Sequence, residues 1–215
     1  MSVLTSEVGI VSEALMQLGL PPVLNLDDDS DAPTRVARRI INQRRQAFLA
    51  NNQWNFATIQ GVATLVADRA PTIDYDAYYS VPADCLRVVR VGSSDDPIGQ
   101  NDWAYQGGEI LYTGDAATIP IEYVKDVTDY SLWSPLVVDA FILELAVKLC
   151  MPLTRDLKMK DFLMKEAVNA YREAAAVDLQ ERPSYFTDAS RTQQAREWMP
   201  SASADFKLDQ SVLDA

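Results

Sequence analysis

Apolar residues near the N-terminus recur at steps of three and four positions. That spacing places them on one face of a helix. Gly19 is suited to end the helix, because glycine readily adopts the left-handed backbone conformation found after helix C-termini. Pro21 and Pro22 prevent the helix from continuing. The pattern predicts a first helix that ends near residue 18, with its apolar face formed by Leu4, Val8, Val11, Leu15 and Leu18.

A second helix is predicted after a loop rich in aspartate. Ser30 or Asp31 is suited to cap it, and Pro33 is tolerated in its first turn. We expect this helix to run to about Asn51 and to pair with the first one as a helical hairpin. Its expected apolar face is Val36, Ile40, Ile41, Ala47 and Phe48.

The middle of the chain, residues 56–130, is richer in β-branched and aromatic residues, with Gly, Pro and Asp between them. Two glycines, Gly107 and Gly108, separate short apolar segments and predict a hairpin. We expect an antiparallel unit of four or five strands. The expected strands cover residues 58–66, 86–91, 103–105, 110–112 and 119–124.

Helix is predicted again from Ser134, which is a cap followed by a proline at the first helical position. Residues 136–151 are apolar on nearly all sides, so this helix should be central and should stop at Pro152. Thr154 is expected to cap a last helix that reaches about Gln180. The apolar face of that helix is Leu163, Ala167, Ala170, Ala174 and Val177.

Residues 183–215 have no regular period but keep large apolar side chains. Such a segment is expected to order on a partner surface as an extended arm. The fold class predicted is therefore α+β. Residues 1–55 and 131–182 form an antiparallel helix bundle of two N-terminal and two C-terminal helices, residues 56–130 form a small inserted antiparallel β unit, and residues 183–215 form the C-terminal arm. The arm residues expected to dock are Tyr185, Phe186, Trp198 and Phe206.

The charge balance restricts the function. The 215 residues include 19 basic and 31 acidic side chains, a net charge of −12, which argues against a free duplex-DNA binder. There is no histidine, which excludes His-based triads and imidazole metal sites. Cys85 and Cys150 are expected to be free thiols. No signal peptide or membrane span is expected, so we expect the chain to be made inside the cell.

The residues offer no catalytic or metal-binding pattern. Asp27, Asp29 and Asp31 have part of the spacing of a calcium loop, but Ala32 and Arg38 occupy the positions that need Gly and Glu. No nucleophile elbow, phosphate loop or dinucleotide fingerprint occurs. We therefore expect no enzyme activity, no cofactor and no metal.

The second helix carries the one concentrated basic feature, in which Arg35, Arg38 and Arg39 share a face. A solvated face, a subunit contact and a DNA contact all remain open. We hypothesise a subunit interface in a ring, where the acidic loop of one subunit meets the arginine face of the next. The acidic residues concerned are Asp27, Asp28 and Asp29. Large aromatics near element junctions predict hinge packing; these are Trp54, Phe56, Trp103, Tyr105 and Trp133.

Several of these features occur together in one known family. Residues 14–23 (ALMQLGLPPV) are followed by the aspartate-rich loop, a helix built around Ala37, Ile40, Ile41 and Arg45, and the exit Trp54-Asn55-Phe56. This arrangement resembles the tail tubular protein A family of short-tailed bacteriophages, which are head-to-tail adaptors. The resemblance is clearest over residues 5–66.

The resemblance implies a structural virion protein, made in the bacterial host cytoplasm, that is not an enzyme. Such adaptors form a dodecameric ring beneath the portal protein and receive the tail nozzle protein and tail fibres. It implies that the helices and arm dock on the portal and that the β unit faces the nozzle and neighbouring subunits. DNA would pass through the acidic lumen without specific binding. The alternatives are a nucleic-acid-binding regulator that uses the arginine helix and a carboxylate-dependent glycan hydrolase of the tail.

Overall fold

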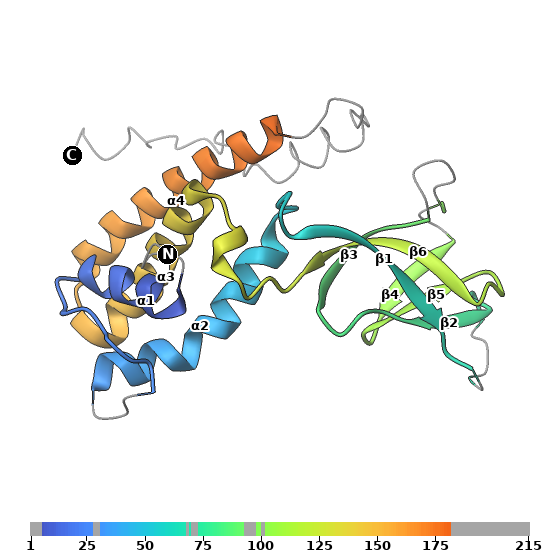
Figure 1. The fold of residues 1–215 in the computed structure, drawn as a ribbon, viewed down its shortest axis with the longest axis horizontal. Helices are drawn as coiled ribbons and strands as arrows, with labels where there is room; N and C mark the ends of the chain where they lie inside the picture. The colour runs from blue at the N-terminus through green and yellow to red at the C-terminus, as the bar shows by residue number, and fades with distance from the viewer. Residues whose placement is uncertain are drawn as a thin grey trace, which may run out of the picture. The chain divides into compact units, whose positions relative to one another are not determined.

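The computed structural model describes residues 6–27, 31–67, 69, 73–92, 98–99 and 102–181. Along the chain, helices precede and follow a β region in these residues, as the colours of Figure 1 show. The elements are α1 (Glu7–Met16), α2 (Ala32–Asn51), β1 (Thr58–Leu65), β2 (Ala77–Ser80), β3 (Cys85–Val91), β4 (Trp103–Gln106), β5 (Glu109–Tyr112), β6 (Thr118–Lys125), the short 3-10 helix η2 (Tyr130–Leu132), α3 (Pro135–Thr154) and α4 (Leu157–Gln180).

Side chains cap the starts of the first two helices, and the cap of α2 is the predicted Asp31. The hydroxyl of Ser6 accepts a hydrogen bond from the backbone N–H of Gly9 at 3.0 Å, which starts α1. The side chain of Asp31 accepts from the backbone N–H of Thr34 at 3.3 Å, which starts α2. Gly19 has a φ of +71°, as expected of a residue that ends a helix in the left-handed region.

The boundary between α3 and α4 differs from the sequence prediction. Pro152 does not end α3, which continues to Thr154 and ends at Arg155, where φ is +57°. A proline this close to the end removes one helical hydrogen bond without stopping the last turn. The expected cap at Thr154 is also wrong: its hydroxyl donates to the carbonyl oxygen of Cys150 at 2.8 Å, and Asp156 caps α4.

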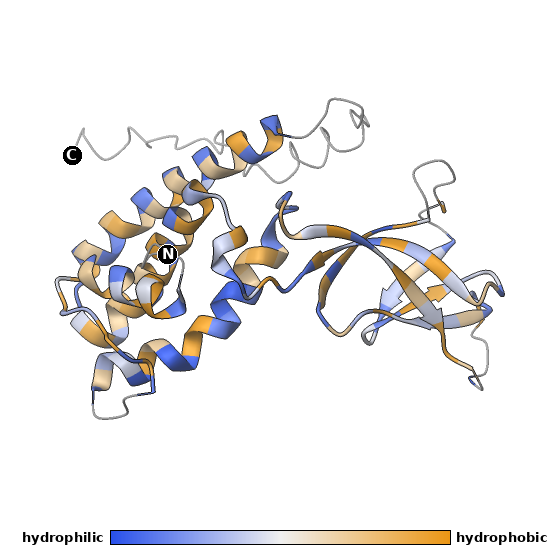
Figure 2. Cartoon of the chain, viewed as in Figure 1, coloured by the Kyte–Doolittle hydropathy of each residue, from blue (hydrophilic) through white to orange (hydrophobic). Residues whose placement is uncertain are grey.

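The helical part is built around α3. The helices α1, α2 and α4 all pack mainly on α3, and α1 and α2 contact each other only slightly. The expected hairpin of the first two helices is therefore a minor contact, because both use their apolar faces against α3. Figure 2 shows hydrophobic and hydrophilic residues alternating along α2, as a helix with one buried face requires. The residues of α2 that are buried are Thr34, Ala37, Ile41, Arg45, Phe48 and Leu49.

The β part is larger than predicted. Six antiparallel strands are found in the described residues, in the order β3-β6-β1-β2-β5-β4, and the sheet curls until it is nearly closed like a barrel (Figure 1). The expectation of an antiparallel helix bundle with a small inserted β unit is therefore wrong. β2 is the strand that the sequence reading missed. It joins the β1–β6 half of the sheet to the β4–β5 hairpin, and without it the two halves could not form one sheet.

The hairpin predicted between β4 and β5 is confirmed. Gly107 and Gly108 have φ values of +62° and +87°, which the two central positions of a tight hairpin turn require. The sheet has its own apolar core, which includes Tyr79, Ile110 and Ile121. The helical core reaches the sheet at Val124 on β6, which is fully buried with the residues of α3.

Candidate interaction surfaces

Arg45 of α2 and Asp126, which follows β6, form a polar link between the helices and the sheet. Arg45 is only 5% exposed, and its Nε donates to Oδ1 of Asp126 at 2.9 Å. Gln46 donates to Oδ2 of the same carboxylate at 2.8 Å. Burial raises the pKa of Asp126, but the hydrogen bonds from Arg45 and Gln46 outweigh it and hold that pKa below its ordinary value. The pair therefore has a structural role.

Aromatic rings pack beside this link. Phe48 of α2 stacks on Trp54 with ring centroids 5.4 Å apart and on Trp133 at 5.9 Å, and it meets Tyr171 of α4 edge-on. The predicted packing at the junction is confirmed for Trp54, Phe56 and Trp133. Trp103 and Tyr105, however, lie in β4 and belong to the sheet.

Asp178 attaches the end of α4 to the exit from α2. Its buried carboxylate accepts the backbone N–H of Asn55 at 3.0 and 3.2 Å, and the Asn55 side chain donates to the carbonyl oxygen of Asp178. A buried carboxylate with these partners is satisfied without a ligand. The buried charges at the junction thus serve to hold α2, α4 and the sheet in place.

The arginine face predicted on α2 is present on the surface. Arg35, Arg38 and Arg39 are exposed, and Arg38 lies 3.9 Å from Asp27 of the same chain. The acidic loop therefore reaches the arginine face of its own subunit at this point. The hypothesis that it meets a neighbouring subunit stays a prediction. Asp28 and Asp29 lie outside the described residues, as do the arm residues Tyr185, Phe186, Trp198 and Phe206.

The described part of the chain contains no group of three or more His, Cys, Asp or Glu side chains placed to hold a metal ion. Cys85 and Cys150 are free, and burial raises the pKa of the Cys85 thiol. Of the helices in these residues, none has the length and apolar character needed to cross a membrane.

The outer face of α4 carries an apolar stripe that the sequence reading did not identify. Its members are between 41% and 64% exposed, although another face of α4, which includes Leu163, is buried against α3. The stripe consists of Leu157, Met164, Val168 and Leu179. Its spacing of seven, four and eleven residues repeats the helical period, and this signal was available in the sequence.

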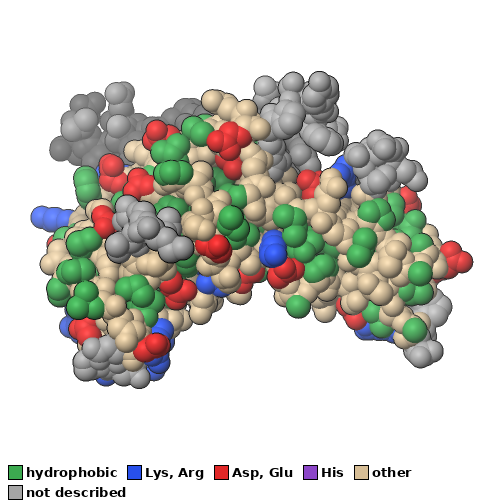
Figure 3. Space-filling view, viewed as in Figure 1, with side chains coloured by type: hydrophobic (Ala, Val, Ile, Leu, Met, Phe, Trp, Pro, Cys, Tyr) green, Lys and Arg blue, Asp and Glu red, His purple; other side chains and the backbone are tan. Residues whose placement is uncertain are grey.

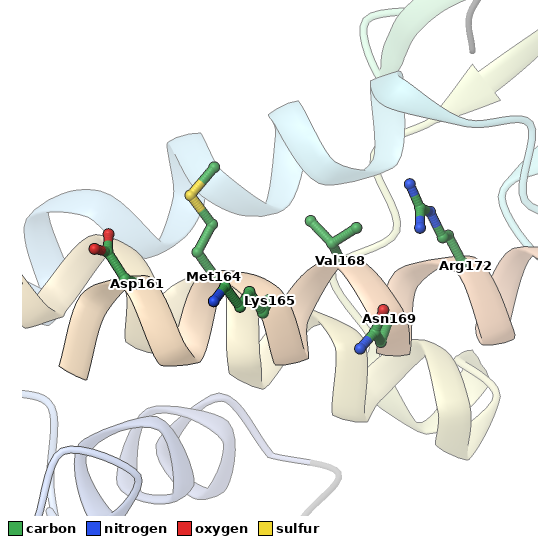
Figure 4. A pocket seen from close by; sticks show the side chains of 6 residues that line it. All are labelled: Asp161, Met164, Lys165, Val168, Asn169 and Arg172. Carbon is green, nitrogen blue, oxygen red and sulfur yellow. The ribbon is translucent and has the colours of Figure 1, made fainter. Parts of the chain in front are cut away.

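A shallow groove of about 570 Å³ lies over the middle of the stripe, and the described residues that line it come from α4 (Figure 4). Met164 and Val168 supply the apolar part, and Lys165 and Arg172 supply positive charge. Among the described residues that line the groove, Asp161 supplies a carboxylate. Figure 3 shows hydrophobic side chains (green) exposed among charged ones on the face in view.

One end of the sheet is acidic. The backbone N–H of Asp76 donates to the carbonyl oxygen of Tyr112 at 3.2 Å, and that of Thr113 donates to the carbonyl oxygen of Asp102 at 3.2 Å, so the loops there lie together. Ile73 projects at the same end and is fully exposed. We call this end the acidic tip. It comprises Ile73 and the exposed carboxylates of Asp74, Asp76, Asp102 and Asp115.

The described surfaces therefore consist of an arginine face, an apolar stripe with basic neighbours and an acidic tip. A scan against models of known protein families finds no match for this sequence, and a search of curated proteins finds no matching relative.

Proposed function

We propose that this chain is a structural subunit of a bacteriophage tail. In this proposal its copies form an adaptor ring between the portal of the filled capsid and the tail nozzle, with tail fibres as further partners. The ring is dodecameric in the family that the sequence resembles, and DNA passes through its lumen during ejection. The site of action is the virion, after synthesis in the host cytoplasm.

The observation that carries the proposal is the apolar stripe on α4. A helix that already buries one face in its own core has no folding reason to carry a second apolar row. Exposed apolar rows bordered by charge are typical of surfaces that bind other proteins. The resemblance of residues 5–66 to head-to-tail adaptors then specifies the kind of assembly.

The acidic character of the chain supports the passage of DNA. With a net charge of −12, a ring of these subunits presents an excess of negative charge, and phosphates are not retained by like charge. The arginines of α2 do not prevent this if they face neighbouring subunits or their own acidic loop, as Arg38 does with Asp27.

The test is assembly with the portal of the same phage. The purified chain is mixed with portal and observed by electron microscopy and by sedimentation, with each protein alone as the control. We expect the chain alone to sediment as a small species and the mixture to contain portal particles that carry an added ring. A chain that stays separate from the portal at all ratios would contradict the proposal.

A chain ending at Glu181 separates the role of the arm from that of the body. Both apolar cores, as far as the described residues show them, are formed before this point, so we expect the shortened chain to fold. Because the arm carries large apolar residues suited to a partner surface, we expect the shortened chain to lose portal docking. Normal docking by the shortened chain would contradict the arm assignment and leave the ring proposal standing.

A further inference from the structure

The chemistry of the α4 groove limits what can occupy it. The apolar stripe is narrow, because its four residues fall within about 60° of arc around the axis of α4. The buried row that includes Leu163 lies about 100° further around the same axis. Lys158, Lys165 and Arg172 follow at intervals of seven residues along the edge of this stripe. An occupant therefore needs an apolar group and negative charge beside it.

A second α4 does not meet this requirement. Two α4 helices packed antiparallel about a two-fold axis would bring both basic rows to the same edge of the contact. Lys165 of one copy would then lie beside Arg172 of the other, and like charges placed together oppose association. The groove is better suited to a different surface, which makes the contact heterologous.

The acidic tip of the sheet has the required chemistry. Ile73 is fully exposed, and the carboxylates of Asp74, Asp76, Asp102 and Asp115 are exposed at the same end of the sheet. The ion pairs found in the described residues involve other acids, such as Glu109 with Arg69 and Glu122 with Arg90, and none of these four. The tip therefore combines an apolar side chain with carboxylates that have no cationic partner among the described ion pairs.

Within one chain, the groove and the tip are not buried against each other. Ile73 of the tip and Met164 and Val168 of the groove are all solvent-exposed in the single chain. A contact between them therefore requires two copies. A contact that joins one surface of a subunit to a different surface of the next repeats from copy to copy, and it forms a ring where the rotation between neighbours closes.

We propose that the acidic tip of one subunit docks in the α4 groove of the next, with Ile73 between Met164 and Val168 and the carboxylates facing Lys165 and Arg172. The proposal rests on the proposed function, because it assigns the contact between neighbours in that ring. The family resemblance implies a ring of subunits but does not specify which two surfaces of neighbouring subunits meet.

Charge exchange tests the pairing. The variant K165E/R172E makes the groove acidic, and D74K/D76K makes the tip basic. In each variant alone, groove and tip have the same sign, so we expect ring formation on portal to fall about tenfold or more. In an equal mixture the two variants alternate with opposite signs at every contact, so ring formation should return.

The matched control is E166K/E173K, which reverses two exposed charges on another face of the same helix. It should assemble like the wild type, and circular dichroism should show that all variants are folded. If the mixture does not recover, the two surfaces are not partners. If K165E/R172E fails with portal and D74K/D76K assembles normally, the groove binds the portal and the pairing is overturned.

Cross-linking gives an independent measurement. Portal-bound rings formed from an equal mixture of I73C and V168C should yield covalent dimers under mild oxidation, and those formed from I73C and A176C should not. Ala176 is exposed on α4 but does not line the groove. Rings that form without the I73C–V168C cross-link would overturn the pairing of tip and groove but not the proposed function. Wild-type chains that form no rings on portal would overturn the proposed function.

Discussion

Arg45 and Asp126 form an ion pair across 81 positions of the chain, with Nε of the arginine 2.9 Å from Oδ1 of the carboxylate. Both side chains are largely buried. The pair joins α2 to the end of β6, and Gln46 beside Arg45 donates to the same carboxylate, so the helical part is fixed against the sheet at this point.

Removing one partner of this pair should destabilise the fold. In Asp126→Ala the guanidinium of Arg45 stays buried without its charge partner, and a broken buried pair costs about 3–5 kcal/mol. Urea unfolding followed by circular dichroism measures the loss. Arg38→Ala removes a long contact between exposed groups and should change the unfolding free energy by less than about 1 kcal/mol. Equal losses in both variants would contradict the role of the pair.

The same pair predicts a pH dependence. Because the folded state lowers the pKa of Asp126 from 3.8, its stabilisation is fully present above that value and is lost as the pH falls through the lower folded pKa. We expect the difference in unfolding free energy between wild type and Asp126→Asn to be largest near pH 7 and to shrink below about pH 4. A difference that stayed constant from pH 7 to pH 3 would show that the carboxylate charge contributes nothing.

Phe48 should be the most sensitive aromatic residue of the junction. It is in contact with the rings of Trp54, Trp133, Phe141 and Tyr171. Phe48→Ala leaves a cavity among them and should cost about 3–5 kcal/mol, with loss of the near-ultraviolet circular dichroism signal of the two tryptophans. Phe162→Ala, at an exposed site of α4, should leave stability almost unchanged.

Charge reversal on the arginine face of α2 tests whether this face serves assembly or DNA binding. Reversal of Arg35, Arg38 and Arg39 to Glu should weaken ring formation on portal, because their positive charge is expected to meet acidic groups of a neighbour. Assembly that is unaffected by the reversal would contradict this interface. A salt-sensitive shift of a short DNA duplex by the wild type, lost in the reversed variant, would instead favour the nucleic-acid-binding alternative.

Several elements could be predicted because their causes are local. Asp31 caps α2 through the backbone N–H of a residue three positions later, and the glycine pair at 107–108 forms a turn within its own hairpin. The long apolar run of α3 predicts a central helix for the same reason, since its pattern lies within one element. The stripe on α4 has the same kind of local signal, although whether a row of apolar residues is buried depends on what packs against it.

What the amino-acid order alone determined was the set of helices, the hairpin and most strands, since caps, turns and periodicity act over a few residues. Only the tertiary structure decided that Ala77–Ser80 forms the strand that unites the sheet and that Arg45 is buried while Arg38 is exposed. The physical reason is that strand pairing and charge burial depend on groups tens of residues away. Their free energy appears only when distant segments meet.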